Sequence, residues 1–308
     1  MNLPSPAYTS SLAPARKRLP VAGGHIQRAG AAPASPPRRA LLKGTVRLLA
    51  LGGCASTLLS AWGGEYTGGD GAQDAPSPVI HSVGNFRDVG GAAPGYSTSD
   101  GAHVRRAFVY RCDALTPNAA DAETLARIAL TNVFDLRTPG EIDVTPEMVP
   151  GTAGYLALNV LGMLAPPSFA GMQAGELDAA MQTHWRACVT GRIQCAAYGA
   201  LLEHIAAAPG PLLICGGTGV DVAGWASALL LLIANVPLEI IEKDFLLTDA
   251  WRWTSIDETN AAPPVQASYL RTAFDALQSN YGTLNRYLTV GLGLASGTVD
   301  RLRGQLVV

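Results

Sequence analysis

A short apolar run that leads through a glycine-rich turn into an almost wholly apolar helix constrains the fold of this chain most. The run is Leu212-Leu213-Ile214, the turn is Cys215-Gly216-Gly217-Thr218-Gly219-Val220-Asp221-Val222, and the helix is Ala223–Ile233. Apolar elements joined so closely predict a buried strand beside a buried helix, as in α/β layers. The turn directs backbone N–H groups and a helix N-terminus at one point, which suits an anion.

The rest of the body repeats this alternation of short apolar runs with segments of helical periodicity. It predicts a single α/β domain over residues 79–308, with a central, mostly parallel sheet flanked by helices. We expect strands at Ala107–Arg111, Asn132–Asp135, Tyr155–Leu158 and Leu212–Ile214. We expect helices at Asp121–Ala129, Ala187–Ala208, Ala223–Ile233, Leu238–Thr248, Tyr269–Ser279, Thr283–Leu288 and Ser296–Leu302. Residues 161–186 lack clear periodicity and are interpreted as a mobile cover over the glycine-rich turn.

Charge is distributed unevenly along the chain. The 308 residues include 22 Lys and Arg against 24 Asp and Glu, but residues 1–64 hold eight of the bases and none of the acids. The remainder therefore carries 14 bases against 24 acids. Because nucleic-acid binding depends on Lys and Arg that neutralise phosphates, this balance argues against a nucleic-acid partner.

The N-terminal segment has the composition of a targeting signal and not that of a folded domain. Residues 1–37 are rich in Ala, Pro, Ser and Arg without periodicity, which predicts a disordered leader. Residues 38–62 resemble a twin-arginine export signal with a lipobox: Arg38 and Arg39 precede an apolar run, and Leu51-Gly52-Gly53-Cys54 would make Cys54 the lipidated residue. An uncleaved anchor is the alternative, although the apolar run is short against the roughly 20 residues that span a bilayer. Residues 63–78 read as a flexible linker, so we expect an exported, periplasmic or cell-envelope lipoprotein.

The cysteines and histidines offer few metal ligands. No CxxC pair occurs, and His184 and His204 have no partner at metal spacing, so we expect no metal site and give these histidines surface or capping roles. Cys188 and Cys195 either form a disulfide or remain free thiols. Cys112 is expected to be a small buried residue. Cys215 is either a nucleophile, activated at the mouth of the turn, or an inert buried thiol.

Three sequence blocks in order resemble the tyrosine/serine phosphatase family of secreted bacterial protein and lipid phosphatases. The first is Asn85-Phe86-Arg87-Asp88-Val89-Gly90-Gly91 with Tyr110-Arg111-Cys112-Asp113-Ala114-Leu115, where the family usually has Ser in place of Cys112. The second is Val133-Phe134-Asp135-Leu136-Arg137-Thr138 with Glu141. The third is the glycine-rich turn and its helix, followed by Lys243-Asp244-Phe245-Leu246-Leu247-Thr248. The resemblance implies a cysteine-dependent phosphatase fold that needs no metal or organic cofactor.

The third block departs from the family pattern His-Cys-x-x-Gly-Lys-Asp-Arg-Thr-Gly. Ile214 precedes the cysteine, one extra residue lies before Gly219, and alignment from Gly219 places Val220 at Lys, Val222 at Arg and Ala223 at Thr. Only Cys215, Gly219, Asp221 and Gly224 match. The resemblance gives Cys215 the role of nucleophile and gives Asp221 either the role of general acid or that of a loop cap. The anion-binding loop comprises Gly216, Gly217, Thr218, Gly219, Val220, Val222, Ala223 and Gly224.

Other side chains of the family blocks are possible anion contacts, namely Arg87, Arg111 and Arg137 with Asp135. The alternative is that these arginines form structural ion pairs with Asp88, Asp113, Asp135 or Glu141.

Two functions follow from the resemblance. One is a phosphatase that hydrolyses phosphate monoesters of proteins or phospholipids through Cys215, impaired by the missing loop Arg and Lys. The other is a catalytically inactive relative that binds a phosphorylated or anionic ligand, or a protein partner, at the cell envelope. A dinucleotide-binding loop matches poorly, because the third small residue is displaced and no acid follows at the end of a second strand.

Overall fold

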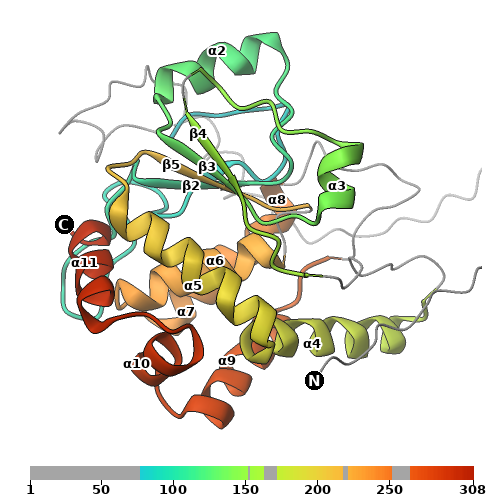
Figure 1. The fold of residues 1–308 in the computed structure, drawn as a ribbon, viewed down its shortest axis with the longest axis vertical. Coiled ribbons are helices and arrows are strands. Elements are labelled where there is room, and N and C mark those ends of the chain that lie inside the picture. Colours follow the sequence, from blue (N-terminus) through green and yellow to red (C-terminus); the bar gives the residue numbers. More distant parts are fainter. Residues whose placement is uncertain (1–76, 152, 163–171, 218–220, 252–263) are drawn as a thin grey trace, which may run out of the picture. The chain divides into compact units, whose positions relative to one another are not determined.

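A computed structural model describes residues 77–151, 153–162, 172–217, 221–251 and 264–308. A five-stranded sheet lies at the centre of this part (Figure 1), in the order β1-β2-β5-β3-β4. The strands are β1 (Arg87–Asp88), β2 (Val109–Cys112), β3 (Asn132–Asp135), β4 (Gly154–Ala157) and β5 (Leu212–Cys215). Only β1 runs antiparallel to its neighbour, and the other pairs are parallel. The predicted α/β domain with a mostly parallel sheet is therefore confirmed.

Helices cover both faces of this sheet. The helices are α2 (Ala119–Ile128), α3 (Pro139–Val144), α4 (Ala174–Thr190), α5 (Arg192–Ala207), α6 (Val222–Ile233), α7 (Leu238–Leu246), α8 (Thr248–Trp251), α9 (Ala267–Tyr281), α10 (Leu284–Arg286) and α11 (Ser296–Leu306), with a π-helical turn at Tyr287–Gly291. Figure 1 shows α2 on one face, and α5 and α6 on the other. The carboxyl ends of β2, β5 and β3 meet at one edge, where the glycine-rich turn begins.

Two apolar clusters follow from the alternation of side chains along the strands. The larger contains Phe134 and Ile214 and packs against α4, α5 and α6. The smaller contains Cys112, Leu213 and Cys215 and packs against α2. Helix α6 is buried on nearly every side, as its apolar sequence predicts, so the turn that precedes it is held between the sheet and the helical layer.

Local sequence explains where several elements begin. Thr138 and Glu141 form a capping box at the start of α3, and Pro139 occupies its first turn. Asn118 caps α2 by accepting a hydrogen bond from the Asp121 N–H.

Two predicted features differ from the structure. The helix expected at 187–208 is two helices, α4 and α5, which meet at Gly191. A Cβ on Gly191 would lie 2.7 Å from the Ala187 carbonyl oxygen, so this tight junction requires glycine. The mobile cover expected at 161–186 is wrong for 174–186, because these residues belong to α4, whose Met181 and Trp185 are buried in the core; residues 163–171 lie outside the described residues.

Candidate functional site

Cys215 lies at the carboxyl end of β5 between two neighbouring strands. Its register partners are Cys112 of β2 and Asp135 of β3, and all three residues are fully buried. The Cys112 thiol donates a hydrogen bond to Cys215 Sγ over 3.4 Å. Main-chain bonds continue the ladder past the strand, since the Gly216 N–H donates to the Cys112 carbonyl and the Leu136 N–H donates to the Cys215 carbonyl. The first N–H of the loop is therefore taken by the sheet instead of facing a ligand.

The surroundings of Cys215 disfavour ionisation of its thiol to the thiolate. Burial raises the pKa of the thiol well above its ordinary value, and contact with Cys112 together with the nearby carboxylates of Glu147 and Asp135 raises it further. Burial also raises the pKa of Cys112. Both sulfurs are consequently protonated thiols at neutral pH.

Arg137 is fully engaged by the acids beside Cys215. Its Nε and Nη2 donate to the two carboxylate oxygens of Asp135 over 2.9 and 2.8 Å, and Nη2 lies 2.7 Å from Glu147 Oε1. The Tyr155 hydroxyl donates a further hydrogen bond to Asp135. Burial raises the pKa of Glu147 to about 7, against the opposing effect of Arg137. Of the two roles expected for Arg137, the structure therefore shows the ion pair with Asp135.

A further carboxylate lies against the loop itself. Glu141, held by the capping box with Thr138, is so close to Gly217 that a Cβ added to Gly217 would collide with Glu141 Oε1. Three acids therefore lie at the start of the loop, and two of them, Asp135 and Glu147, share the cation of Arg137.

Asp221 is the N-cap of α6 and accepts a hydrogen bond from the Val222 N–H over 2.7 Å. Its other oxygen lies 2.8 Å from Nε2 of His184, a residue of α4. Burial alone lowers the pKa of His184, but its hydrogen bonds and charge interactions with Asp221 and Cys188 raise it to about 10. Burial alone raises the pKa of Asp221, but His184 and the Val222 N–H hold it below its usual value. At neutral pH the pair is an imidazolium and a carboxylate.

This pair corrects the surface or capping role expected for His184. Its side chain is only 11% exposed, and it joins α4 to the start of α6. The sequence signal available was weak: His184 stands one helical turn before Cys188, whose Sγ lies 3.7 Å from the same Nε2. Asp221, 37 residues away, could not be recognised as its partner from a single sequence.

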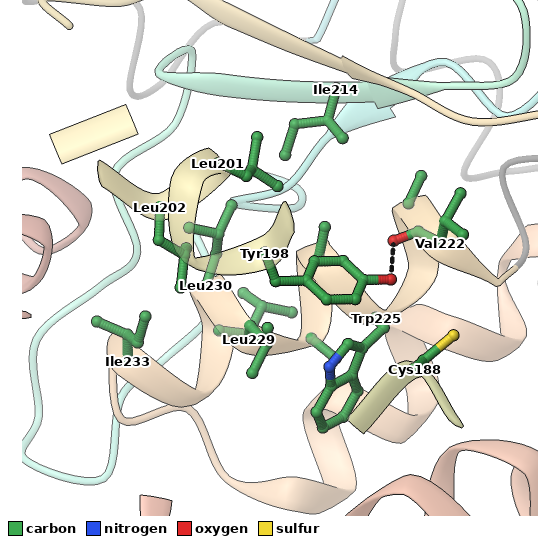
Figure 2. Packing of buried hydrophobic residues seen from close by; sticks show 14 of the residues in the cluster. Cys188, Tyr198, Leu201, Leu202, Ile214, Val222, Trp225, Leu229, Leu230 and Ile233 are labelled. Atoms are coloured by element: carbon green, nitrogen blue, oxygen red, sulfur yellow. Dashed lines mark hydrogen bonds between the residues drawn. The ribbon is translucent and has the colours of Figure 1, made fainter. Parts of the chain in front are cut away.

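The described residues at the end of the loop, from Val222 to Gly224, are packed in the core. Val222 and Ala223 are buried, and the Tyr198 hydroxyl of α5 donates to the Val222 carbonyl over 3.1 Å (Figure 2). An added Cβ on Gly224 would lie 3.4 Å from the Trp185 ring, an ordinary van der Waals contact. Thr218, Gly219 and Val220 lie outside the described residues.

Arg87 of β1 and Arg111 of β2 are register partners, and the alternation of side chains places them on the face of the sheet opposite to Cys112 and Cys215. The Arg87 Nε lies 3.4 Å from Asp244 Oδ1, so its ion-pair partner is Asp244 rather than Asp88. Burial and the neighbouring charge of Arg87 lower the pKa of Arg111 to about 9. An added Cβ on Gly224 would lie 3.7 Å from Arg111 Nη2. The structure therefore separates these two arginines from the Cys215 thiol.

Cys188 and Cys195 are free thiols, so the disulfide left open by the sequence is absent. The Cys195 thiol donates instead to the Val189 carbonyl, and Cys188 contacts His184. Cys54 lies outside the described residues. Among the described residues no group of three His, Cys, Asp or Glu could hold a metal, and no helix is long and apolar enough to cross a membrane.

Comparison with known proteins identifies the family. The model of the tyrosine phosphatase family matches residues 78–308. The chain belongs to this family. Its members are associated with phosphorylated substrates or ligands. A search of curated proteins found no match.

Two solved structures show a distant similarity to the chain. The core catalytic domain of the PP-IP phosphatase SIW14 from S. cerevisiae in complex with citrate is 14% identical, with a TM-score of 0.31 over 68% of this chain and 94% of that chain. A second structure, of the Siw14 catalytic core, is 14% identical, with a TM-score of 0.24 over 59% of this chain and 95% of that chain.

Proposed function

We propose that this member of the tyrosine phosphatase family does not hydrolyse phosphate monoesters and instead binds a protein partner at the cell envelope. The observation that carries the proposal is the state of Cys215, a fully buried thiol whose pKa is raised first by burial and then by the neighbouring Cys112, Glu147 and Asp135. The thiolate is the nucleophilic form of cysteine, so a protonated thiol cannot attack phosphorus efficiently.

The second requirement of the family chemistry, a general acid, is also unmet. Asp221 is the residue that the resemblance assigns to this role, but its ion pair with His184 lowers its pKa. A carboxylate that is ionised at neutral pH has no proton to give to the leaving oxygen. Asp221 instead caps α6.

No cation takes the place of the missing loop arginine in the described part of the loop. Val222 stands where the family carries Arg, and Arg137 is engaged by Asp135 and Glu147. Loss of an arginine that stabilises a transferring phosphoryl group costs roughly 10³- to 10⁵-fold in rate in other systems. The Glu141 carboxylate against Gly217 also disfavours a phosphate dianion there, and for this reason we propose a protein partner in place of a phosphorylated ligand.

Hydrolysis of an aryl phosphate and of phosphoinositides by the full chain tests the proposal. We expect wild type and Cys215→Ser to give the same rate as buffer, and Val222→Arg to leave the rate unchanged. Binding of inorganic phosphate is measured in parallel by calorimetry, and no heat of binding is expected. Turnover that disappears in Cys215→Ser would overturn the proposal, and a phosphate titration that saturates would replace the protein partner by an anionic ligand.

A further inference from the structure

Three charged side chains are buried together at the carboxyl end of β3. Asp135 ends this strand, Arg137 lies in the turn after it, and Glu147 comes from the segment 145–151, which follows α3. Arg137 Nη2 lies 2.8 Å from Asp135 Oδ2 and 2.7 Å from Glu147 Oε1, so one nitrogen contacts both carboxyl groups. None of the three side chains is more than 1% exposed. Two acids and one base are therefore shielded from solvent in this cluster.

Two buried carboxylates beside a single guanidinium would leave one negative charge uncompensated. Burial of such a charge is costly, and an acid avoids the cost by keeping its proton. The hydrogen bonds indicate which acid keeps it. Asp135 accepts bonds from the Arg137 backbone N–H, Nε and Nη2 and from the Tyr155 hydroxyl. Glu147 accepts the Leu115 N–H besides its contact with Arg137, so it is the acid that is less stabilised as an anion.

The two carboxyl groups also contact each other. A hydrogen bond joins Glu147 to Asp135, and two carboxyl groups can share a hydrogen bond only when one of them carries a proton. Burial raises the pKa of Glu147 to about 7, and the charge of Asp135 contributes in the same direction, whereas Arg137 opposes the shift. The other titratable groups that interact with Glu147 come from β2, β5 and β4, and they are Cys112, Cys215 and Tyr155.

Glu147 fastens the segment 145–151 to the loop that follows β2. The Leu115 N–H donates to Glu147 Oε2, and the Met148 N–H donates back to the Leu115 carbonyl over 2.8 Å. Val149 packs against the smaller apolar cluster, which includes the cysteines at the ends of β2 and β5. Ionisation of Glu147 therefore weakens the attachment of a segment that packs beside these cysteines.

We propose that the proton on Glu147 is a switch, which holds the segment 145–151 closed in acid and lets it open as the pH rises to neutral. When Glu147 loses this proton, its hydrogen bond to Asp135 is lost and the two carboxylates repel each other. Opening of the segment returns the Glu147 carboxylate to water and exposes this side of the two cysteines.

The direction of the switch follows from linkage. The pKa of Glu147 in the closed segment, about 7, exceeds its ordinary value of 4.5. The stabilisation of the closed segment is therefore complete below pH 4.5 and is lost as the pH rises through 7. The inference is independent of the proposed function, because the segment can open whether or not the domain hydrolyses phosphate or binds a partner.

Hydrogen exchange of the two amides that tie the segment to the loop tests the switch. Exchange of the full chain is followed by mass spectrometry at pH 5, 6 and 7, and each rate is divided by the intrinsic rate of the unfolded peptide at that pH. We expect the protection of the peptides that contain Leu115 and Met148 to fall about tenfold or more between pH 5 and pH 7 in wild type.

Matched variants assign the effect to one carboxyl group. Glu147→Gln has a similar shape and no proton to lose, so its Leu115 and Met148 peptides should keep at pH 7 the protection that they have at pH 5. Glu147→Met, which is also uncharged, takes its place if circular dichroism shows that the amide variant is not folded. Glu203→Gln removes an exposed acid of α5 and should reproduce the pH dependence of wild type.

Three outcomes would overturn the inference. One is protection that stays constant from pH 5 to pH 7 in wild type, and another is the same fall in the uncharged variants of Glu147. The third is an equal fall in every peptide, that of β5 included, which would show global unfolding instead of an opening of this segment. These readouts involve neither hydrolysis nor a partner, so they distinguish failure of the switch from failure of the proposed function.

Discussion

His184 and Asp221 form a largely buried ion pair beside the glycine-rich turn. The two side chains are 11% and 14% exposed and lie 2.8 Å apart. We predict that His184→Ala lowers the free energy of unfolding by about 3 kcal/mol, because it leaves the Asp221 carboxylate buried without its charged partner. Urea denaturation at pH 6 measures the loss. A double-mutant cycle with Asp221→Asn provides the control, and additive effects of the two substitutions would contradict a direct interaction.

The same pair gives stability a defined dependence on pH. The folded pKa of His184, about 10, exceeds its unfolded value of 6.5, so its contribution is complete below pH 6.5 and is lost as the pH rises towards 10. The lowered pKa of Asp221 makes its contribution complete above pH 3.8 and lost as the pH falls below that value. We predict that the stability difference between wild type and His184→Ala, obtained from urea curves, is largest between these limits. A difference that is the same at pH 6 and pH 10 would exclude the charged pair.

Close packing between α5 and the C-terminal segment makes the cost of one glycine substitution predictable. A Cβ on Gly199 of α5 would collide with the Leu292 carbonyl oxygen. We predict that Gly199→Ala destabilises the domain by about 1 to 3 kcal/mol, since overpacking outweighs the better helix propensity of alanine. Thermal unfolding measures the change.

Gly304 of α11 is the matched control for this substitution. It is exposed, and an added Cβ there would meet no atom within 4 Å. Gly304→Ala should therefore raise stability by up to about 1 kcal/mol through helix propensity alone. Equal effects of the two substitutions would show that contact with Leu292 is unimportant.

Most helices and strands could be predicted from local sequence. Boundaries that depend on tertiary contacts could not. The apolar run of β5 and the apolar helix α6 were predictable because both are buried on nearly all sides. Helix α4 was missed because its buried residues are few: Met181, Trp185 and Cys188 follow helical spacing but are diluted by Ala, Thr and Gln. Its separation from α5 depends on the tight turn at Gly191.

The place of Cys215 in the fold was predictable from the sequence, but the side chains that surround it were not. The strand, turn and helix place Cys215 where the resemblance expects it, at the carboxyl end of β5. The groups that define its chemistry come from other strands and helices: Cys112 is 103 residues away, and His184 reaches Asp221 from α4. Pairings over such distances depend on the assembled sheet and helical layer. Periodicity in one sequence cannot indicate them.

At the scale of the whole molecule, charge and the family match change at about the same place in the sequence, where the predicted export segment ends. The family match begins at residue 78, directly where the predicted linker ends, and the eight bases that precede residue 65 are balanced by no acid. The acid-rich remainder should be repelled by anionic lipid headgroups. A binding domain of this charge would need the predicted anchor to remain at a membrane.

We therefore predict that the whole protein is attached to a membrane through a lipid on Cys54. In a bacterial host that processes lipoproteins, we expect the full chain to sediment with membranes and its mature N-terminus to be a diacylglycerol-modified Cys54, detected by mass spectrometry. Cys54→Ser should abolish the lipid mass, and Arg38→Lys/Arg39→Lys should leave the chain unexported, because the paired arginines carry the resemblance to the export signal. A mature N-terminus at another residue would contradict the prediction, as would membrane association that survives Cys54→Ser, because the anchor would then be the uncleaved apolar run.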